Sequence, residues 1–202
     1  MKRRRLFPVQ IDRDFVSRWS RRYANTAKEE ELLTNVGPAV ARRGYYKMEE
    51  LAQVGEWKSP RIRKRLAQNS AVDVEDITRL ALAAPERLQH RVLGLLHGVR
   101  DPVASAALTI WAPDRHTVLD FRVTEALDRL NRLGALPETL PQHEAGSLPD
   151  YVAYLECCRR IARRLNVGLR DLDRALWQWS KEGMPHGPKD EVRARGPRAR
   201  RA

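Results

Sequence analysis

The residue best suited to chemistry in this sequence is Asp120, in the segment Val-Leu-Asp-Phe-Arg-Val at positions 118–123. An aspartate in front of an amphipathic segment is a favoured helix N-cap, so its role could be purely structural. A capping carboxylate accepts backbone N–H bonds, and these bonds keep it ionised. An ionised carboxylate can stabilise an oxocarbenium-like sugar while a base–sugar bond breaks, or orient a water molecule. The two roles are compatible.

A second segment, at positions 95–108, has the pattern of two helices joined by a tight turn. It reads Leu-Leu-His-Gly-Val-Arg-Asp-Pro-Val-Ala-Ser-Ala-Ala-Leu, with small residues opening the second helix. Small side chains let two helices cross closely, and the turn and the second helix's N-terminus then offer N–H groups to a phosphate. An ordinary connection between two helices is the alternative interpretation.

Together these segments resemble the helix-hairpin-helix superfamily of DNA glycosylases. The family's hairpin reads Leu-Pro-Gly-Val-Gly, followed by a helix that begins near an alanine. The matching positions here are Leu96, Gly98, Val99 and Ala104. Arg100 replaces the second glycine. The family also carries a Val-Asp-x-x-Val pattern about twenty residues after the hairpin, and Asp120 with Val123 reproduces Asp-x-x-Val at that spacing.

The resemblance covers about residues 85–130 and implies an all-α fold of two lobes, with a cleft that receives a flipped nucleotide. It implies that Asp120 is the catalytic carboxylate. It also implies contacts between double-stranded DNA and the hairpin residues His97, Gly98, Val99, Arg100 and Ala104. Family members that also cleave the strand use a lysine just inside the second hairpin helix, where this sequence has Pro102. The resemblance thus implies a monofunctional glycosylase that leaves an abasic site.

Aromatic residues near position 50 are candidates for the wall of a base pocket, because aromatic faces can sandwich an extruded base. These are Tyr45, Tyr46 and Trp57, and core packing is the alternative for each. His116 lies four residues before Asp120 and could line the same pocket or protonate a leaving base. A surface or capping role is the alternative for this histidine.

Basic residues are concentrated at positions 57–68, which we expect to form one helix. Lys58, Arg61 and Lys64 could follow DNA phosphates, and a solvated helix face is the alternative. Lys58 or Lys64 could replace the missing hairpin lysine only if the fold brings it near Asp120. The spacing of histidines and carboxylates predicts no metal site, and we expect no cofactor.

The net charge of +12 is concentrated near the two ends of the chain, in residues 2–5 and after Gly183. Basic tails attract any polyanion, so charge alone only weakly favours nucleic acid as the partner. Binding to acidic lipid or to an acidic partner, or a role in solubility, would explain the same charge. We expect one domain at 1–182, followed by a basic, disordered tail at 183–202.

The only cysteines, Cys157 and Cys158, are neighbours, and adjacent cysteines rarely pair. They lie at apolar-face spacing with Tyr154 and Ile161, which predicts buried thiols in a reducing compartment. No apolar run is long enough to span a bilayer, and no apolar stretch follows the basic start as in a signal peptide. The expected location is therefore cytoplasmic, without a membrane or an obligate protein partner.

Helical periodicity dominates the sequence, and no alternating stretch predicts a strand. The first helix carries Phe15, Trp19 and Tyr23 on one face. A loop is expected at 134–149. Further helices are expected at 27–43, with a break at Gly37-Pro38, and at 48–54, 57–68, 86–96, 101–111, 120–133, 148–165 and 169–181. One more helix is expected to begin after a cap at Asp73.

The function predicted from these features is hydrolytic removal of a modified or damaged base from DNA. The biological role would be DNA repair or defence against phages with modified genomes. A non-catalytic helix-hairpin-helix protein that binds DNA structure is the alternative, and an RNA-binding or ribosome-associated basic protein is a third possibility. An acidic group at position 120 that faces an open cleft would favour the enzyme.

Overall fold

The computed structural model describes residues 9–144 and 146–184, and this part of the chain is 66% helical without any strand. The predicted all-α class is therefore confirmed. Among the described residues no helix has the length and apolar character needed to cross a membrane. The basic cluster at 2–5 and all but the first two residues of the tail at 183–202 lie outside the described residues.

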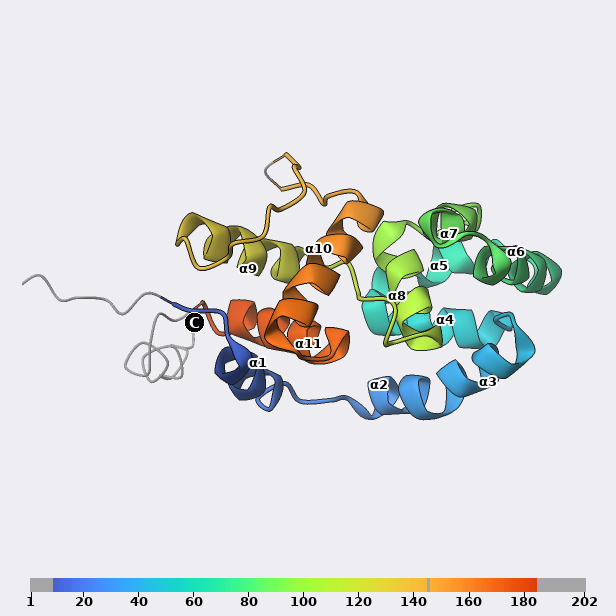
Figure 1. The fold of residues 1–202 in the computed structure, drawn as a ribbon. Helices are drawn as coiled ribbons and strands as arrows, with labels where there is room; N and C mark the ends of the chain where they lie inside the picture. The colour runs from blue at the N-terminus through green and yellow to red at the C-terminus, as the bar shows by residue number, and fades with distance from the viewer. Residues whose placement is uncertain (1–8, 145, 185–202) are drawn as a thin grey trace, which may run out of the picture.

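The helices form two groups, which we call the terminal lobe and the central lobe (Figure 1). The terminal lobe contains α1 (Arg13–Ser20), α9 (Phe121–Arg132), α10 (Tyr151–Leu165) and α11 (Leu169–Lys181). The central lobe contains α2 (Ala27–Glu31), α3 (Gly37–Arg43), α4 (Met48–Lys58), α5 (Arg63–Leu66), α6 (Ala71–Ala83), α7 (Glu86–Leu93) and α8 (Asp101–Trp111). The chain crosses between the lobes at 21–26 and again at 112–120.

Within each lobe, the main contacts are between helices of that same lobe. In the terminal lobe α11 packs on α1 and α9, and in the central lobe α4 packs on α8 while α6 packs on α7. Helix α8 is buried along most of its length, and its small residues include Ala104 and Ala107. Gly37 at the start of α3 lies so close to α8 that a Cβ there would be 2.3 Å from the carbonyl oxygen of Ile110. Small residues thus allow the close approach of helices that builds the central lobe.

The sequence patterns at 101–111 and 169–181 predicted α8 and α11 with the observed bounds. A break was predicted at Gly37-Pro38. The structure has a π-helical turn just before it, over Leu32–Val36, and this turn leads directly into α3. A π-helical turn is a common site of a helix kink, and Pro38 cannot donate a backbone hydrogen bond. The cap predicted at Asp73 is instead Ser70, whose Oγ accepts a hydrogen bond from the Asp73 N–H at 3.0 Å.

The single helix predicted at 57–68 is wrong. Helix α4 continues to Lys58, Ser59 is extended with φ −160° and ψ 107°, and a 3₁₀ turn at Pro60–Ile62 precedes α5. The residue before a proline is driven out of the helical region by the proline ring, which explains the break at Ser59. Trp57 and Lys58 therefore lie on a different element from Arg61 and Lys64.

Cys157 and Cys158 are free, buried thiols on α10, as their position on the apolar face predicted. Burial raises the pKa of both thiols. They therefore remain protonated near neutral pH and behave as small apolar side chains of the core.

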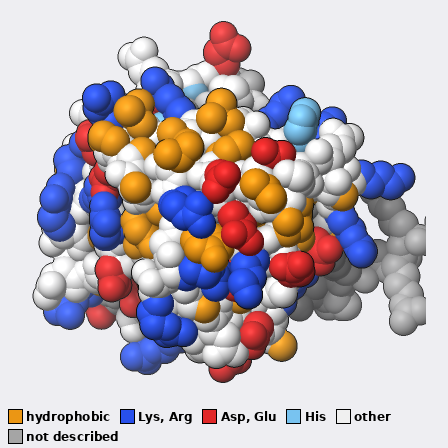
Figure 2. Space-filling model, turned by 90° about the vertical axis from the view of Figure 1, so that its right-hand side faces the viewer, with side chains coloured by type: hydrophobic (Ala, Val, Ile, Leu, Met, Phe, Trp, Pro, Cys, Tyr) orange, Lys and Arg blue, Asp and Glu red, His pale blue; other side chains and the backbone are white. Residues whose placement is uncertain are grey.

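The end face of the central lobe has a mixed surface. Hydrophobic side chains gather across its upper part, with side chains of both charges below them (Figure 2). Large exposed hydrophobic residues of this lobe include Val72 and Leu80 on α6 and Leu95 after α7. This face therefore offers no continuous basic surface to a polyanion.

Candidate active site

A cavity of about 300 Å³ lies where the two lobes meet. This volume is at the lower end of the range for small-molecule sites. Its wall contains aromatic, cationic and acidic side chains from both lobes and from both crossing segments. The lining residues are Tyr23, Trp57, Lys58, Val118, Asp120, Arg122, Arg170, Asp173 and Trp177.

Asp120 caps α9 and faces this cavity at the same time. Its Oδ1 accepts a hydrogen bond from the Arg122 N–H at 2.9 Å, and its Oδ2 pairs with the Lys58 ammonium. The Asp120 side chain is 24% exposed. The capping role is thus present in the structure, and the carboxylate also remains accessible from the cavity. Its catalytic role stays a prediction.

The segment that carries Asp120 is held by both lobes. The Leu119 N–H donates to Ser105 Oγ on α8 at 2.9 Å, and the Tyr154 hydroxyl on α10 donates to the Val118 carbonyl at 3.0 Å. Leu119 itself is fully buried. These bonds fix the backbone on the N-terminal side of Asp120, so the carboxylate has a defined position.

Lys58 lies on the last turn of α4 and crosses from the central lobe to Asp120. Its side chain is only 10% exposed, so it is part of the cavity wall and not of the DNA-facing surface predicted for it. Lys64, by contrast, is exposed on α5 and does not line the cavity. Of the two lysines considered as replacements for the hairpin lysine, the fold brings Lys58 to Asp120.

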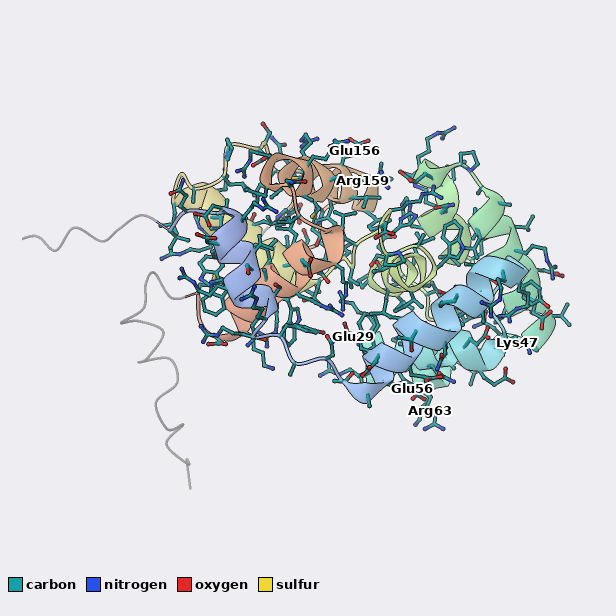
Figure 3. All side chains as sticks on the ribbon, turned by 60° about the horizontal axis from the view of Figure 1, so that its bottom comes forward. Glu29, Lys47, Glu56, Arg63, Glu156 and Arg159 are labelled. Atoms are coloured by element: carbon teal, nitrogen blue, oxygen red, sulfur yellow. The ribbon has the colours of Figure 1, made fainter. Side chains whose placement is uncertain are left out.

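A buried ionic cluster joins the lobes beside the cavity. Glu29 of α2 is fully buried and pairs with Arg170 and Arg174 of α11, the latter at 2.9 Å. The Tyr23 hydroxyl donates to its other carboxylate oxygen at 2.7 Å. Burial acts to raise the pKa of Glu29, but Arg170, Tyr23 and Arg174 hold it below its usual value. Glu29 lies where the start of α2 approaches the terminal lobe (Figure 3).

Aromatic rings and guanidinium groups lie against one another in the wall. Tyr23 meets Trp177 edge to face with ring centroids 5.3 Å apart, and the Arg122 guanidinium lies 5.6 Å from the Trp177 ring. Arg170 lies 5.5 Å from the ring of Trp57. Aromatic faces and arginine planes are the groups on which proteins stack unpaired bases.

The pocket roles predicted for Tyr45 and Tyr46 need correction, because neither lines this cavity. Tyr46 is fully buried in the core of the central lobe, where its hydroxyl donates to the Ala107 carbonyl at 2.7 Å. The ring of Tyr45 contacts two guanidinium groups, those of Arg43 at 4.8 Å and Arg79 at 4.4 Å from its centroid. Of the three predicted aromatic residues, Trp57 lines the cavity.

His116 also lies away from the cavity, in the core between α8 and α10. Its Nδ1 is 3.1 Å from the Tyr151 hydroxyl, and its ring lies 6.0 Å from that of Trp111. Burial lowers the pKa of His116 to about 4. A neutral, enclosed histidine cannot protonate a leaving base in this cavity, so the role predicted for it is replaced by a packing role.

The buried His116 predicts acid sensitivity. Its folded-state pKa of about 4 is below the unfolded value of 6.5, so the stability it contributes is present above pH 6.5 and is lost toward pH 4. The expected loss from this residue is about 3 kcal/mol. Urea unfolding at pH 7 and pH 4 should show a smaller acid loss for His116→Gln than for the wild type. The exposed His97→Gln variant should behave as the wild type does. Equal losses in all three proteins would contradict this account.

In the segment predicted as a hairpin, α7 is followed by a turn through Gly98 and then by α8. Gly98 has φ +82°, and a Cβ there would lie 2.9 Å from Arg65 Cβ. Asn69, just after α5, also holds the turn, because its Oδ1 accepts from the His97 N–H at 2.8 Å and its Nδ2 donates to the His97 carbonyl at 3.0 Å. The hairpin turn therefore packs directly on α5 and the residues that follow it.

Val99 and Ala104 shape the hairpin and do not face solvent. Their exposed fractions are 3% and 0%, and their N–H groups donate to the carbonyls of Leu96 and Arg100. The DNA contacts predicted for these two residues are therefore corrected to a packing role. His97 and Arg100 are exposed, as are the basic residues of the adjoining segment. We call this set the basic hairpin surface: Arg61, Arg63, Lys64, Arg65, His97 and Arg100.

The basic hairpin surface begins close to the cavity along the chain. Only Ser59 and Pro60 separate Lys58 from Arg61. Arg63 lies beside Glu56 of α4, with Arg63 Nε 3.5 Å from Glu56 Oε1 (Figure 3). The extended Ser59 thus joins a cavity residue to a surface that is suited to phosphates.

Sequence reasoning missed Tyr23, Arg170 and Asp173 as cavity residues. Arg170 and Glu29 are 141 residues apart, so no local spacing joins them. One signal was present in the sequence, since Asp173 interrupts the otherwise apolar face of a helix that contains Leu169, Leu172 and Leu176. Buried charges on such a face require partners from elsewhere in the fold.

Within the described residues no cluster of three or more histidine, cysteine or acidic side chains has the arrangement of a metal site. The chain matches no protein-family model, no curated protein and no solved structure in the comparisons. The functional interpretation therefore depends on the cavity and on the basic hairpin surface.

Proposed function

We propose that the protein is a DNA glycosylase that receives a modified or damaged base from double-stranded DNA in the cavity and hydrolyses its N-glycosidic bond. One observation carries the proposal: the Asp120 carboxylate faces a cavity between two lobes whose wall contains the rings of Tyr23, Trp57 and Trp177. The biological role would be DNA repair or defence against phages with modified genomes.

The basic hairpin surface supports DNA as the partner. Its cationic side chains are exposed, and the hairpin turn packs against α5, so the two basic segments are neighbours in space. Phosphate contacts orient a protein on DNA without reading the sequence. Such contacts would hold the duplex while one nucleotide leaves the stack and enters the cavity.

The chemistry assigned to Asp120 follows from its position. Breaking the C1′–N bond places positive charge on the sugar, and a fixed carboxylate stabilises that charge. Because Asp120 is held by the Arg122 N–H and by Lys58, little reorganisation is needed during the reaction. Water then adds to C1′, and an abasic site remains.

A panel of duplexes tests the proposal, each with one modified or damaged base, together with phage genomes that carry hypermodified bases. Incubation with the protein, followed by alkali, should break the strand at the modified position of at least one substrate. Binding to these duplexes without base release from any of them would favour the non-catalytic helix-hairpin-helix alternative.

DNA affinity should depend steeply on salt, because phosphate contacts release counterions. Replacing Arg61, Lys64 and Arg100 together by alanine should reduce the slope of log affinity against log salt by roughly 3, about one per lost contact. Fluorescence anisotropy with a labelled duplex at several salt concentrations measures this slope. Arg132→Ala, at the exposed end of α9, is the control. An unchanged slope in the triple variant would exclude the basic hairpin surface as the DNA-binding face.

The position of Lys58 beside Asp120 makes it the residue to test for a second activity, cleavage of the strand at the abasic site, although its pairing with the carboxylate opposes attack by the amine. A lysine amine can form a Schiff base with C1′ of the opened sugar. Pro102 removes the amine from the hairpin, but Lys58 supplies one beside Asp120 from another element. Trapping with borohydride separates this activity from simple hydrolysis.

A further inference from the structure

A second carboxylate lines the cavity and has no role in the mechanism described so far. Asp173 lies on α11, and its side chain is 7% exposed, compared with 24% for Asp120. It is therefore the more deeply buried of the two carboxylates in the wall. A base inserted beyond its sugar would reach the buried carboxylate, while the sugar would remain near the more exposed one.

Charged and titratable groups from several elements surround Asp173. Its Oδ2 pairs with Arg170 of the same helix, and Arg170 is itself held by the buried Glu29 of α2. Lys58 of α4 and Asp120 at the start of α9 also act on its charge. On the side of α10 it interacts electrostatically with the Tyr154 hydroxyl and the Cys158 thiol.

Burial raises the pKa of Asp173 to about 6, although Arg170 and Lys58 act to lower it. The cavity thus contains one enclosed carboxyl that holds a proton in mildly acidic solution and one more exposed carboxylate paired with Lys58. Two carboxyl groups in contrasting environments are the arrangement that enzymes use to divide acid and anion roles in glycosyl cleavage.

We propose that Asp173 is the general acid that protonates the leaving base, while Asp120 stabilises the sugar. This inference rests on the proposed glycosylase function and specifies its substrate class: bases that are neutral in DNA and would otherwise leave as anions. Because Arg170 occupies Oδ2, the transferred proton belongs to Oδ1.

The step balances as a hydrolysis. The C1′–N bond breaks, its electron pair goes to the base nitrogen, and the proton of Asp173 moves to that nitrogen, so the base leaves neutral. Water adds its oxygen to C1′ and gives its proton to Asp120, which returns it to solvent. Asp173 takes a proton from solvent before the next cycle.

The test compares neutral and cationic leaving bases in otherwise identical duplexes. Hypoxanthine, 8-oxoguanine, uracil and 5-hydroxymethyluracil are the neutral bases, and 7-methylguanine is the cationic base, which leaves without needing a proton. For a neutral base, wild-type single-turnover release should fall as the pH rises above about 6. Asp173→Asn should lower that release by ~10²-fold or more and remove this pH dependence. Release of 7-methylguanine should fall far less.

Asp171→Asn is the matched control, because it removes the same charge from an exposed position on the same helix. If Asp173→Asn fails to fold, the wild-type pH profiles for neutral and cationic bases still decide the matter. Equal losses for both kinds of base, or a neutral-base profile without the fall above pH 6, would overturn the acid role. Release of 7-methylguanine alone by the wild type would also overturn it and leave the glycosylase proposal intact. Release of no base would overturn the glycosylase proposal itself.

Discussion

Asp120→Asn is expected to lower the rate of base release by ~10²-fold or more, while the protein stays folded and keeps its DNA affinity. The asparagine oxygen can still accept the Arg122 N–H bond that caps α9, so the helix start is preserved. The negative charge beside the developing sugar cation is lost. Loss of the charge from the largely buried pair with Lys58, whose side chain is 10% exposed, should cost roughly 1–3 kcal/mol of stability. Single-turnover base release, thermal unfolding and anisotropy measure the three quantities.

Asp150→Asn is the matched control for this variant. Asp150 caps α10 through bonds from the Val152 and Ala153 N–H groups, at 3.0 and 3.1 Å, but does not line the cavity. The Asp150→Asn variant therefore removes the same charge as Asp120→Asn, from a helix cap that lies outside the cavity. Normal base release by Asp120→Asn, or an equal loss in both variants, would show that Asp120 is only a cap.

Lys58→Met should reduce base release by a similar factor, because it removes the partner that holds Asp120 Oδ2 in the cavity. Lys58→Arg should restore part of the activity, since a guanidinium can hold a carboxylate equally well. Lys47→Met, at the opposite end of α4, is the control and should release base at the wild-type rate. Equal loss in the arginine and methionine variants would mean that the amine itself reacts.

Borohydride trapping tests whether the Lys58 amine forms a covalent bond with the DNA sugar. An ammonium group paired with a carboxylate has no free electron pair, so we expect no covalent protein–DNA adduct from the wild type and intact abasic strands until alkali is added. An adduct that forms with the wild type and disappears in Lys58→Met would establish Lys58 as a Schiff-base nucleophile. The monofunctional assignment would then be withdrawn.

Local patterns in the sequence correctly predicted several helices and one helix cap. The small residues of α8 and the apolar period of α11 predicted both helices, and an aspartate before an amphipathic stretch predicted the cap of α9. The break at Ser59 had a local signal too, because it precedes Pro60. Applying that rule would have placed Lys58 at the end of α4.

The composition of the cavity could not be predicted in the same way. Tyr23, Glu29 and Arg170 meet only because two crossing segments bring α11 against the start of α2. The sequence also cannot distinguish a buried aromatic residue from one in a pocket. Tyr46 and Trp57 have similar surroundings along the chain, yet one is sealed in the core and the other lines the cavity.

The most direct test of the central claim is mass spectrometry of the free bases released from modified duplexes and phage genomes by the wild type and by Asp120→Asn. The account predicts that the wild type releases an intact modified base, with one new abasic site for each base. Asp120→Asn should release almost none at equal DNA occupancy, and Asp150→Asn should match the wild type. Equal release by the wild type and Asp120→Asn, or no release from DNA that the protein binds tightly, would contradict it.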